Sequence, residues 1–107
     1  MHAFDVLGDP VRRRILELLA DGELSSGALT TVVQAEFGIS QPAVSQHLKV
    51  LTEAGLVTVR AAGTRRIHEL DPQGLAGLRD YLDGFWNRSL AAYARAAEDH
   101  HTRQEHR

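Results

Sequence analysis

The apolar residues near the start of the chain recur at helical spacing, which predicts an amphipathic helix. This helix is expected to begin after Asp9, an N-cap residue that precedes a proline, and to end at Gly22. Its buried stripe is predicted to consist of Val11, Ile15, Leu18 and Leu19. Charged side chains occupy its other faces, so one side of the helix packs on a core.

A second helix is predicted over Ser26–Phe37, with Ser25 or Ser26 as its N-cap and Gly38 as its end. The β-branched cluster at residues 30–33 leaves a strand open as an alternative, because helices disfavour such residues. The flanking caps favour the helix.

A third helix is predicted to begin at Ser40 and to end at Gly55, with Pro42 tolerated in its first turn. Val44, Leu48 and Leu51 supply its buried stripe. Its exposed face is small or polar and carries almost no charge in the early turns.

The rest of the chain predicts a β-hairpin followed by a long helix. Residues 56–60 and 64–70 are rich in Val, Ile and Thr, and residues 61–63 are expected to form a three-residue loop. Asp71 and a following proline then open the last helix, whose broad apolar stripe continues to Tyr93. Fraying is expected in the polar segment from His100 onward.

Composition limits the classes of function. The chain has 107 residues and a formal net charge of -2, as expected for one globular domain, and it contains no cysteine. The absence of cysteine excludes disulfides, thiolate nucleophiles and Cys-ligated zinc. No signal sequence or membrane-spanning run is found, so a cytoplasmic protein is expected. No nucleophile, base and orienting group occur together, so neither an enzyme nor a cofactor is expected.

The second and third predicted helices, joined by the turn at residues 38–40, fit a helix-turn-helix whose second helix enters the major groove of DNA. Glutamine and serine side chains can donate and accept hydrogen bonds at base edges, and alanine can contact a thymine methyl group. A merely solvated helix face is the alternative. Because such faces usually carry many Glu and Lys residues, the nearly uncharged face favours DNA recognition.

Three stretches of the chain resemble repressors of the ArsR family: GDPVRRRILELL, SQPAVSQHLKVLTEAGL and VTVRAAGTRRIHELDP. The resemblance extends from about Ala3 to Tyr93 and implies a mainly α winged helix-turn-helix with a two-stranded β-hairpin wing. The expected element order is α-α-α-α-β-β-α. Residues 1–99 are predicted as one such domain with dimerisation helices at both ends, and residues 100–107 as a polar tail.

The predicted DNA contacts combine the polar helix face with the family resemblance. On the third helix they are Ser40, Gln41, Ala43, Ser45, Gln46, His47 and Lys49. Gln41 and Gln46 are the expected base readers, whereas packing is as good an interpretation as base contact for His47. On the wing they are Arg60, Arg65 and Arg66, with solubility of the hairpin as the alternative. Arg12–Arg14 are weaker candidates.

A homodimer on an inverted-repeat DNA operator is expected, because one recognition helix makes too few base contacts for specificity. The family resemblance places the interface on the last helix and the N-terminal segment. The residues expected there are Phe4, Leu7, Leu78, Leu82, Phe85, Trp86 and Tyr93. The alternative for the aromatic residues is an ordinary intrachain core.

Many ArsR relatives sense metals, but the family's thiolate site is impossible here. A zinc-responsive repressor is the first alternative function, using Asp99, His100, His101, Glu105 and His106, although these lack the spacing of the family's second metal site. No metal site is therefore predicted, and no inducer follows from these residues. A winged-helix module that binds protein instead of DNA is the second alternative.

Overall fold

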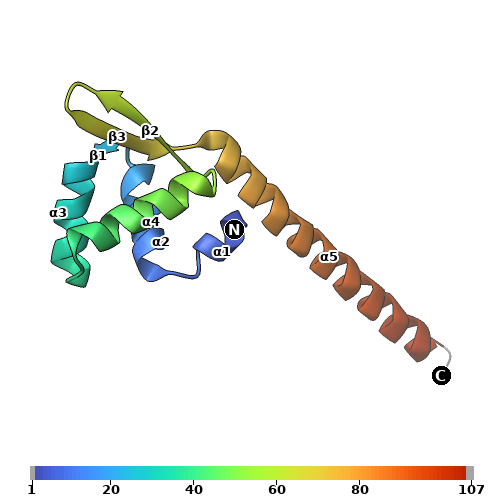
Figure 1. Ribbon diagram of the computed structural model, residues 1–107. Helices are drawn as coiled ribbons and strands as arrows, with labels where there is room; N and C mark the ends of the chain where they lie inside the picture. The colour runs from blue at the N-terminus through green and yellow to red at the C-terminus, as the bar shows by residue number, and fades with distance from the viewer. Residues whose placement is uncertain (1, 106–107) are drawn as a thin grey trace. The chain divides into compact units, whose positions relative to one another are not determined.

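The computed structural model describes residues 2–105, with side chains for residues 2–99. The chain forms two units that divide after Ala76. The helices and strands follow in the order α1 (Ala3–Val6), α2 (Pro10–Ala20), β1 (Leu24–Ser25), α3 (Ser26–Phe37), α4 (Gln41–Glu53), β2 (Val57–Ala62), β3 (Arg65–Leu70) and α5 (Pro72–Glu105) (Figure 1). The expected mainly α architecture with a β-hairpin wing is confirmed. The short strand β1 is an addition that the sequence did not predict.

The helix ends lie where the capping residues predict them. Asp9 accepts hydrogen bonds from the backbone N–H groups of Val11 (2.8 Å) and Arg12 (3.2 Å). Partial burial opposes ionisation of the Asp9 carboxyl, but these donors and the nearby His47 and Arg12 charges outweigh it and lower its pKa. The carboxylate therefore satisfies two N–H groups that the first turn of α2 leaves without partners.

The segment with the β-branched cluster is the helix α3. Ser25 caps it by accepting a hydrogen bond from the N–H of Ala28 at 3.1 Å, and Gly38 ends it with φ 67°. Leu29 and Val33 are fully buried, so tertiary packing adds to the caps and outweighs the weak helix propensity of the cluster. The left-handed backbone at position 38 favours glycine.

One core joins α2, α3 and α4, which contact one another pairwise. Its largest fully buried side chains include one from α2, one from α3 and one from α4: Ile15, Leu29 and Leu51. Leu56 is also fully buried. It lies in the turn after α4, whereas the sequence predicted it as part of a strand. This core fixes which face of α4 points away from the protein.

The wing is an antiparallel hairpin of β2 and β3, and β1 extends it to a three-stranded sheet in the order β1-β3-β2. The predicted three-residue loop is wrong. Ala61 and Ala62 continue β2 and pair with Arg66 and Arg65, so the turn contains only two residues. Gly63, with φ 64°, takes the first turn position, where a positive φ matches the twist of the flanking strands.

The second unit is the part of α5 from Gly77 onward. Its exposed large apolar side chains are Tyr81, Leu82, Phe85, Trp86, Leu90 and Tyr93, whereas Leu78 is buried. Tyr81 and Phe85 pack edge to face with ring centroids 5.0 Å apart, and the Arg88 guanidinium lies 4.9 Å from the centroid of Phe85. The helix continues to Glu105, past the position where the sequence predicts fraying.

Candidate nucleic-acid interface

The turn between α3 and α4 is held by local hydrogen bonds. Ser40 caps α4 by accepting from the N–H of Ala43 at 3.3 Å, as the sequence predicted. The Gln34 side-chain amide of α3 donates to the carbonyl of Ile39 at 3.3 Å, an interaction that the sequence did not reveal. The first contact stabilises the start of α4, and the second links the end of α3 to the turn.

The buried stripe of α4 leaves a polar face exposed. Val44 and Leu51 are fully buried, and Leu48 is almost so. Each turn of α4 therefore places this stripe inside and the opposite side chains in solvent. The predicted contact residues that are exposed are Ser40, Gln41, Ser45, Gln46 and Lys49.

Two other predicted contact residues of α4 lie at the edge of this face. Ala43 and His47 are half-buried. His47 is close enough to Asp9, at the start of α2, to contribute to the lowered pKa of the Asp9 carboxyl. Gln46, one position earlier, is exposed.

The three arginines of the wing are exposed but not equivalent. The Arg60 guanidinium lies 2.6 Å from the carboxylate of Glu23, the residue that precedes β1. Within residues 2–99, neither Arg65 nor Arg66 has an ion-pair partner. The latter two cations are therefore available to an anionic partner without breaking an ion pair.

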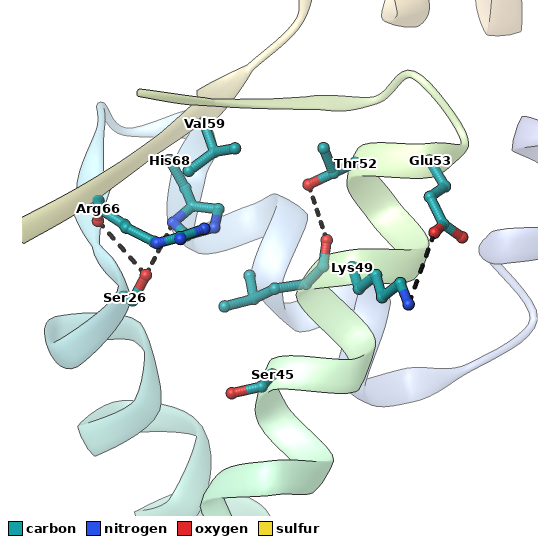
Figure 2. A pocket seen from close by; sticks show the side chains of 9 residues that line it. Ser26, Ser45, Lys49, Thr52, Glu53, Val59, Arg66 and His68 are labelled. Carbon is teal, nitrogen blue, oxygen red and sulfur yellow. Dashed lines mark hydrogen bonds and ion pairs between the residues drawn. The ribbon is translucent and has the colours of Figure 1, made fainter. Parts of the chain in front are cut away.

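A hollow of about 610 Å³ separates α4 from the wing (Figure 2). The α4 side of the hollow includes Ser45, Leu48 and Lys49. Val59 and Arg66 belong to the wing side. Three predicted DNA contacts, on two elements far apart in the sequence, thus border one depression.

His68 of β3 also lines this hollow, and the sequence did not single it out. Its side chain is buried, and its Nδ1 lies 3.3 Å from the Ser26 hydroxyl, which itself donates to the carbonyl of Arg66 at 3.4 Å. Burial, followed by the charge of Arg66, lowers the pKa of His68. A neutral imidazole therefore links the base of the wing to the start of α3.

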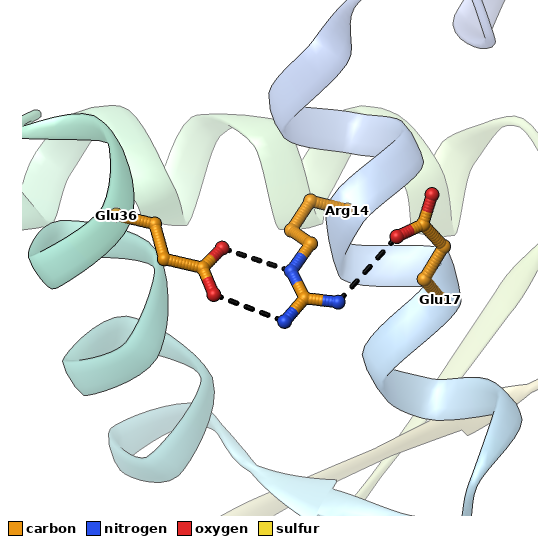
Figure 3. Close-up of polar contacts among 3 residues, drawn as sticks. All are labelled: Arg14, Glu17 and Glu36. Carbon is orange, nitrogen blue, oxygen red and sulfur yellow. Dashed lines mark hydrogen bonds and ion pairs between the residues drawn. The ribbon is translucent and has the colours of Figure 1, made fainter.

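The arginines at the start of α2 mainly serve the fold. Figure 3 shows Arg14 in a two-pronged contact with Glu36 of α3, at 2.8 and 2.9 Å, and a longer one with Glu17 at 3.4 Å. The hydrogen bonds from Arg14 lower the pKa of the Glu36 carboxyl. Arg12 and Arg13 donate to the carbonyl groups of Val6 and Leu7.

No group of three or more metal-binding side chains occurs among the residues whose side chains are described. The side chains of His100, His101, Glu105 and His106, named for the zinc alternative, lie outside that part. Between residues 2 and 105, no helix is both long and apolar enough to cross a membrane.

The arrangement of these elements defines a class of protein. A helix-turn-helix with an exposed polar second helix and a basic hairpin beside it is a winged helix-turn-helix. A family model described as a helix-turn-helix domain matches residues 7–60.

Known proteins place the chain within this class. It is 53% identical to the HTH-type transcriptional regulator Rv2034 of Mycobacterium tuberculosis, over 87% of this chain and 83% of that one. It is 38% identical to the arsenical resistance operon repressor of Staphylococcus xylosus, over 73% and 71%. A homodimeric winged helix-turn-helix DNA-binding domain from Mycobacterium bovis, described as a possible ArsR-family transcriptional regulator, matches with TM-score 0.61 and 28% identity, over 79% of this chain and 75% of that one. The chain belongs to the ArsR family of helix-turn-helix transcriptional regulators.

Proposed function

We propose that this protein is a transcriptional repressor that binds an inverted-repeat operator as a homodimer. The observation that carries the proposal is the exposed, nearly uncharged start of α4 beside Arg65 and Arg66 of the wing, which have no ion-pair partner among the side chains of residues 2–99. Polar side chains that both donate and accept suit base edges, whereas guanidinium groups suit phosphates.

The residues divide into two roles. Gln41 and Gln46 read base edges in the major groove, where a glutamine can make two hydrogen bonds to adenine. Ser40, Ser45 and Lys49 contact the phosphate backbone or neighbouring bases, and Ala43 contacts a thymine methyl group. Arg65 and Arg66 contact phosphates or the adjacent minor groove. His47 and Arg60 belong to the same surface but contribute less, because His47 is half-buried and Arg60 is paired with Glu23.

The exposed apolar side chains of α5 are proposed as the dimer surface. Trp86 and Tyr93 are 65% and 76% exposed. Large apolar side chains exposed together typically mark a surface that binds another protein. Leu82 and Phe85 extend this face, and Phe4 and Leu7 are assigned to the same interface. Leu78, which the sequence also suggested, is buried in the protomer and is not an exposed part of this face. The homodimeric relative from Mycobacterium bovis supports this assembly.

Occupation of an operator by such a dimer excludes other proteins from the same DNA, which is the simplest route to repression. The similarity to the arsenical resistance operon repressor of Staphylococcus xylosus supports repression rather than activation of transcription. A cytoplasmic location and the absence of enzymatic activity go with this function. Among residues 2–99, whose side chains are described, no group of metal-binding side chains supports the zinc-responsive alternative.

Selection of bound sequences from random duplexes, followed by sedimentation of the selected complex, tests the proposal. We expect an enriched inverted repeat, with half-sites about one helical turn apart, bound by two protomers. A duplex with one half-site scrambled is the matched control and should lose most of the affinity. A single protomer on an asymmetric site, or no enriched sequence at physiological salt, would contradict the proposal.

A further inference from the structure

The hollow between α4 and the wing combines the properties of a small-molecule site. Its volume of about 610 Å³ is typical of ligand pockets, which range from about 300 to 1,000 Å³. Leu48 and Val59 give it apolar surface from two opposite elements, and the imidazole of His68 lies between polar and apolar neighbours (Figure 2). Ligand sites typically join such apolar lining to a few directed polar groups.

One polar atom at this site has a defined hydrogen-bonding role. The Ser26 hydroxyl lies within hydrogen-bond distance of the Arg66 carbonyl (3.4 Å), which can only accept, and of Nδ1 of His68 (3.3 Å). We assign its one hydrogen to the carbonyl, so that its oxygen accepts from Nδ1–H of His68. With Nδ1 protonated in a neutral ring, Nε2 is left as an acceptor. Every fully buried polar side-chain atom in the described part has a partner, and Nε2 has none, so Nε2 reaches solvent.

The charges around the hollow favour an anion. Lys49 and Arg66 border it together with a single acidic group, Glu53, which lies 4.0 Å from Lys49. Arg66 has no ion-pair partner among the described residues, and its charge acts on His68. A cation and a hydrogen-bond acceptor thus lie near each other beside apolar surface.

We propose that this hollow binds a small aromatic hydroxycarboxylate and that the bound compound competes with DNA. The ring packs against Leu48 and Val59, the hydroxyl donates to Nε2 of His68, and the carboxylate pairs with Arg66. Because Ser45, Lys49 and Arg66 are also proposed DNA contacts, an occupied hollow blocks part of the DNA surface. The competition rests on the proposed function, whereas binding of the compound does not.

The first experiment uses the full ¹⁵N-labelled chain without DNA and the three isomers of hydroxybenzoate as probes. We expect saturable shifts of the amide signals of Leu48, Val59 and His68, with a dissociation constant on the order of 1 mM for a compound of this size. Benzoate lacks the hydroxyl that contacts His68, and the methyl ester of the best isomer lacks the carboxylate that contacts Arg66. Each should bind about fivefold more weakly, the effect of one hydrogen bond.

Two variants of the same strand test the location. Val59→Trp fills the hollow and should abolish the shifts. Thr58→Trp places the same side chain on the opposite face of β2 and should leave them unchanged. Shifts confined to other residues, equal binding of all the probes, or unchanged binding to Val59→Trp would overturn the proposed site.

The second experiment adds the best isomer to the complex of the wild-type protein with its selected duplex. We expect the apparent affinity for DNA to fall in proportion to the occupancy of the hollow. Val59→Trp, which fills the hollow itself, should bind the duplex more weakly than wild type and should show no further loss when the compound is added. Shifts at the hollow with unchanged DNA affinity would overturn the competition. Failure to bind any duplex would instead contradict the proposed function and leave the result of the first experiment intact.

Discussion

Arg60 of β2 and Glu23, the residue before β1, form an ion pair with a distance of 2.6 Å between nitrogen and oxygen. Both side chains are about half exposed, at 51% and 49%, so the pair stabilises the protein by at most about 1 kcal/mol. The pair nevertheless distinguishes Arg60 from its neighbours, because Arg65 and Arg66 have no such partner within residues 2–99.

This difference predicts unequal effects of the wing arginines on DNA binding. Arg65→Ala should weaken binding to all sequences alike and reduce the slope of log K against log salt by about 1, as expected for one lost phosphate contact. Arg60→Ala should have a smaller effect, because Arg60 must first leave Glu23. Fluorescence anisotropy of a labelled duplex, measured over a range of salt concentrations, gives both slopes.

Glu23→Gln completes this comparison. Removing the carboxylate frees Arg60, so DNA affinity at low salt should rise and the slope should steepen. Equal slopes for Arg60→Ala and Arg65→Ala, together with no effect of Glu23→Gln, would mean that the ion pair does not restrain Arg60 in solution.

Two glycines of α5 should respond to alanine in opposite directions. A Cβ atom at Gly74 would collide with the carbonyl oxygen of Gly55, whereas nothing lies within 4 Å of a Cβ atom at Gly77. Gly74→Ala should therefore destabilise the protein by about 1–3 kcal/mol through steric overlap. Gly77→Ala should stabilise the helix by up to about 1 kcal/mol. Urea unfolding measures both, and destabilisation by both would contradict the local geometry.

The cap of α2 predicts a specific loss of stability. Asp9→Ala removes the acceptor of two backbone N–H groups and should lower the free energy of unfolding by about 1 kcal/mol at pH 7. Asp21→Ala, at the other end of the same helix, changes the same kind of residue and serves as the control. An equal effect of the two substitutions on urea unfolding would argue against the cap.

The Asp9 cap should also have a pH signature. Because its folded-state pKa is lowered below the ordinary value of 3.8, the cap's ionic contribution is complete above that value and disappears as the pH falls through the folded pKa. Acid titration of stability should therefore be shallower for Asp9→Ala than for wild type.

His68 predicts a second pH dependence, at higher pH. Its folded-state pKa lies below the ordinary value of 6.5, so below about pH 6.5 the unfolded chain takes up a proton that the folded chain does not. Stability should fall as the pH is lowered through this window. His68→Gln should flatten that part of the profile of urea midpoint against pH. An unchanged slope in this variant would show that His68 is not the responsible group.

Local sequence signals predicted most of the fold. Asp9, Ser25, Ser40 and Gly38 mark helix ends because a capping side chain or a left-handed glycine acts within a few residues. The exposed face of α4 was predictable for the same reason, since its buried stripe has helical spacing. The turn of the wing was not, because alternation of polar and apolar residues is weak in β2, whose residues after Val57 are all exposed.

Contacts between segments far apart in the chain could not be predicted from the sequence. Strand β1 has only two residues and exists through pairing with β3, in which Leu24 lies opposite His68. The pairs Glu23–Arg60 and Arg14–Glu36 likewise join residues far apart in the chain, so no local pattern identifies them. A prediction from the sequence therefore finds the exposed polar face of α4 but not which cations of the wing lack an ion-pair partner within residues 2–99.

Base reading by α4 is the central claim, and a comparison of sequence selections tests it most directly. Random duplexes are selected in parallel with the wild-type protein, with Gln46→Ala, and with Gln73→Ala as a control outside α4. We predict that wild type and the control enrich the same inverted repeat, and that Gln46→Ala loses base preference at one symmetric pair of positions while still binding DNA. The same motif at full strength for Gln46→Ala, or no motif for wild type, would contradict the account.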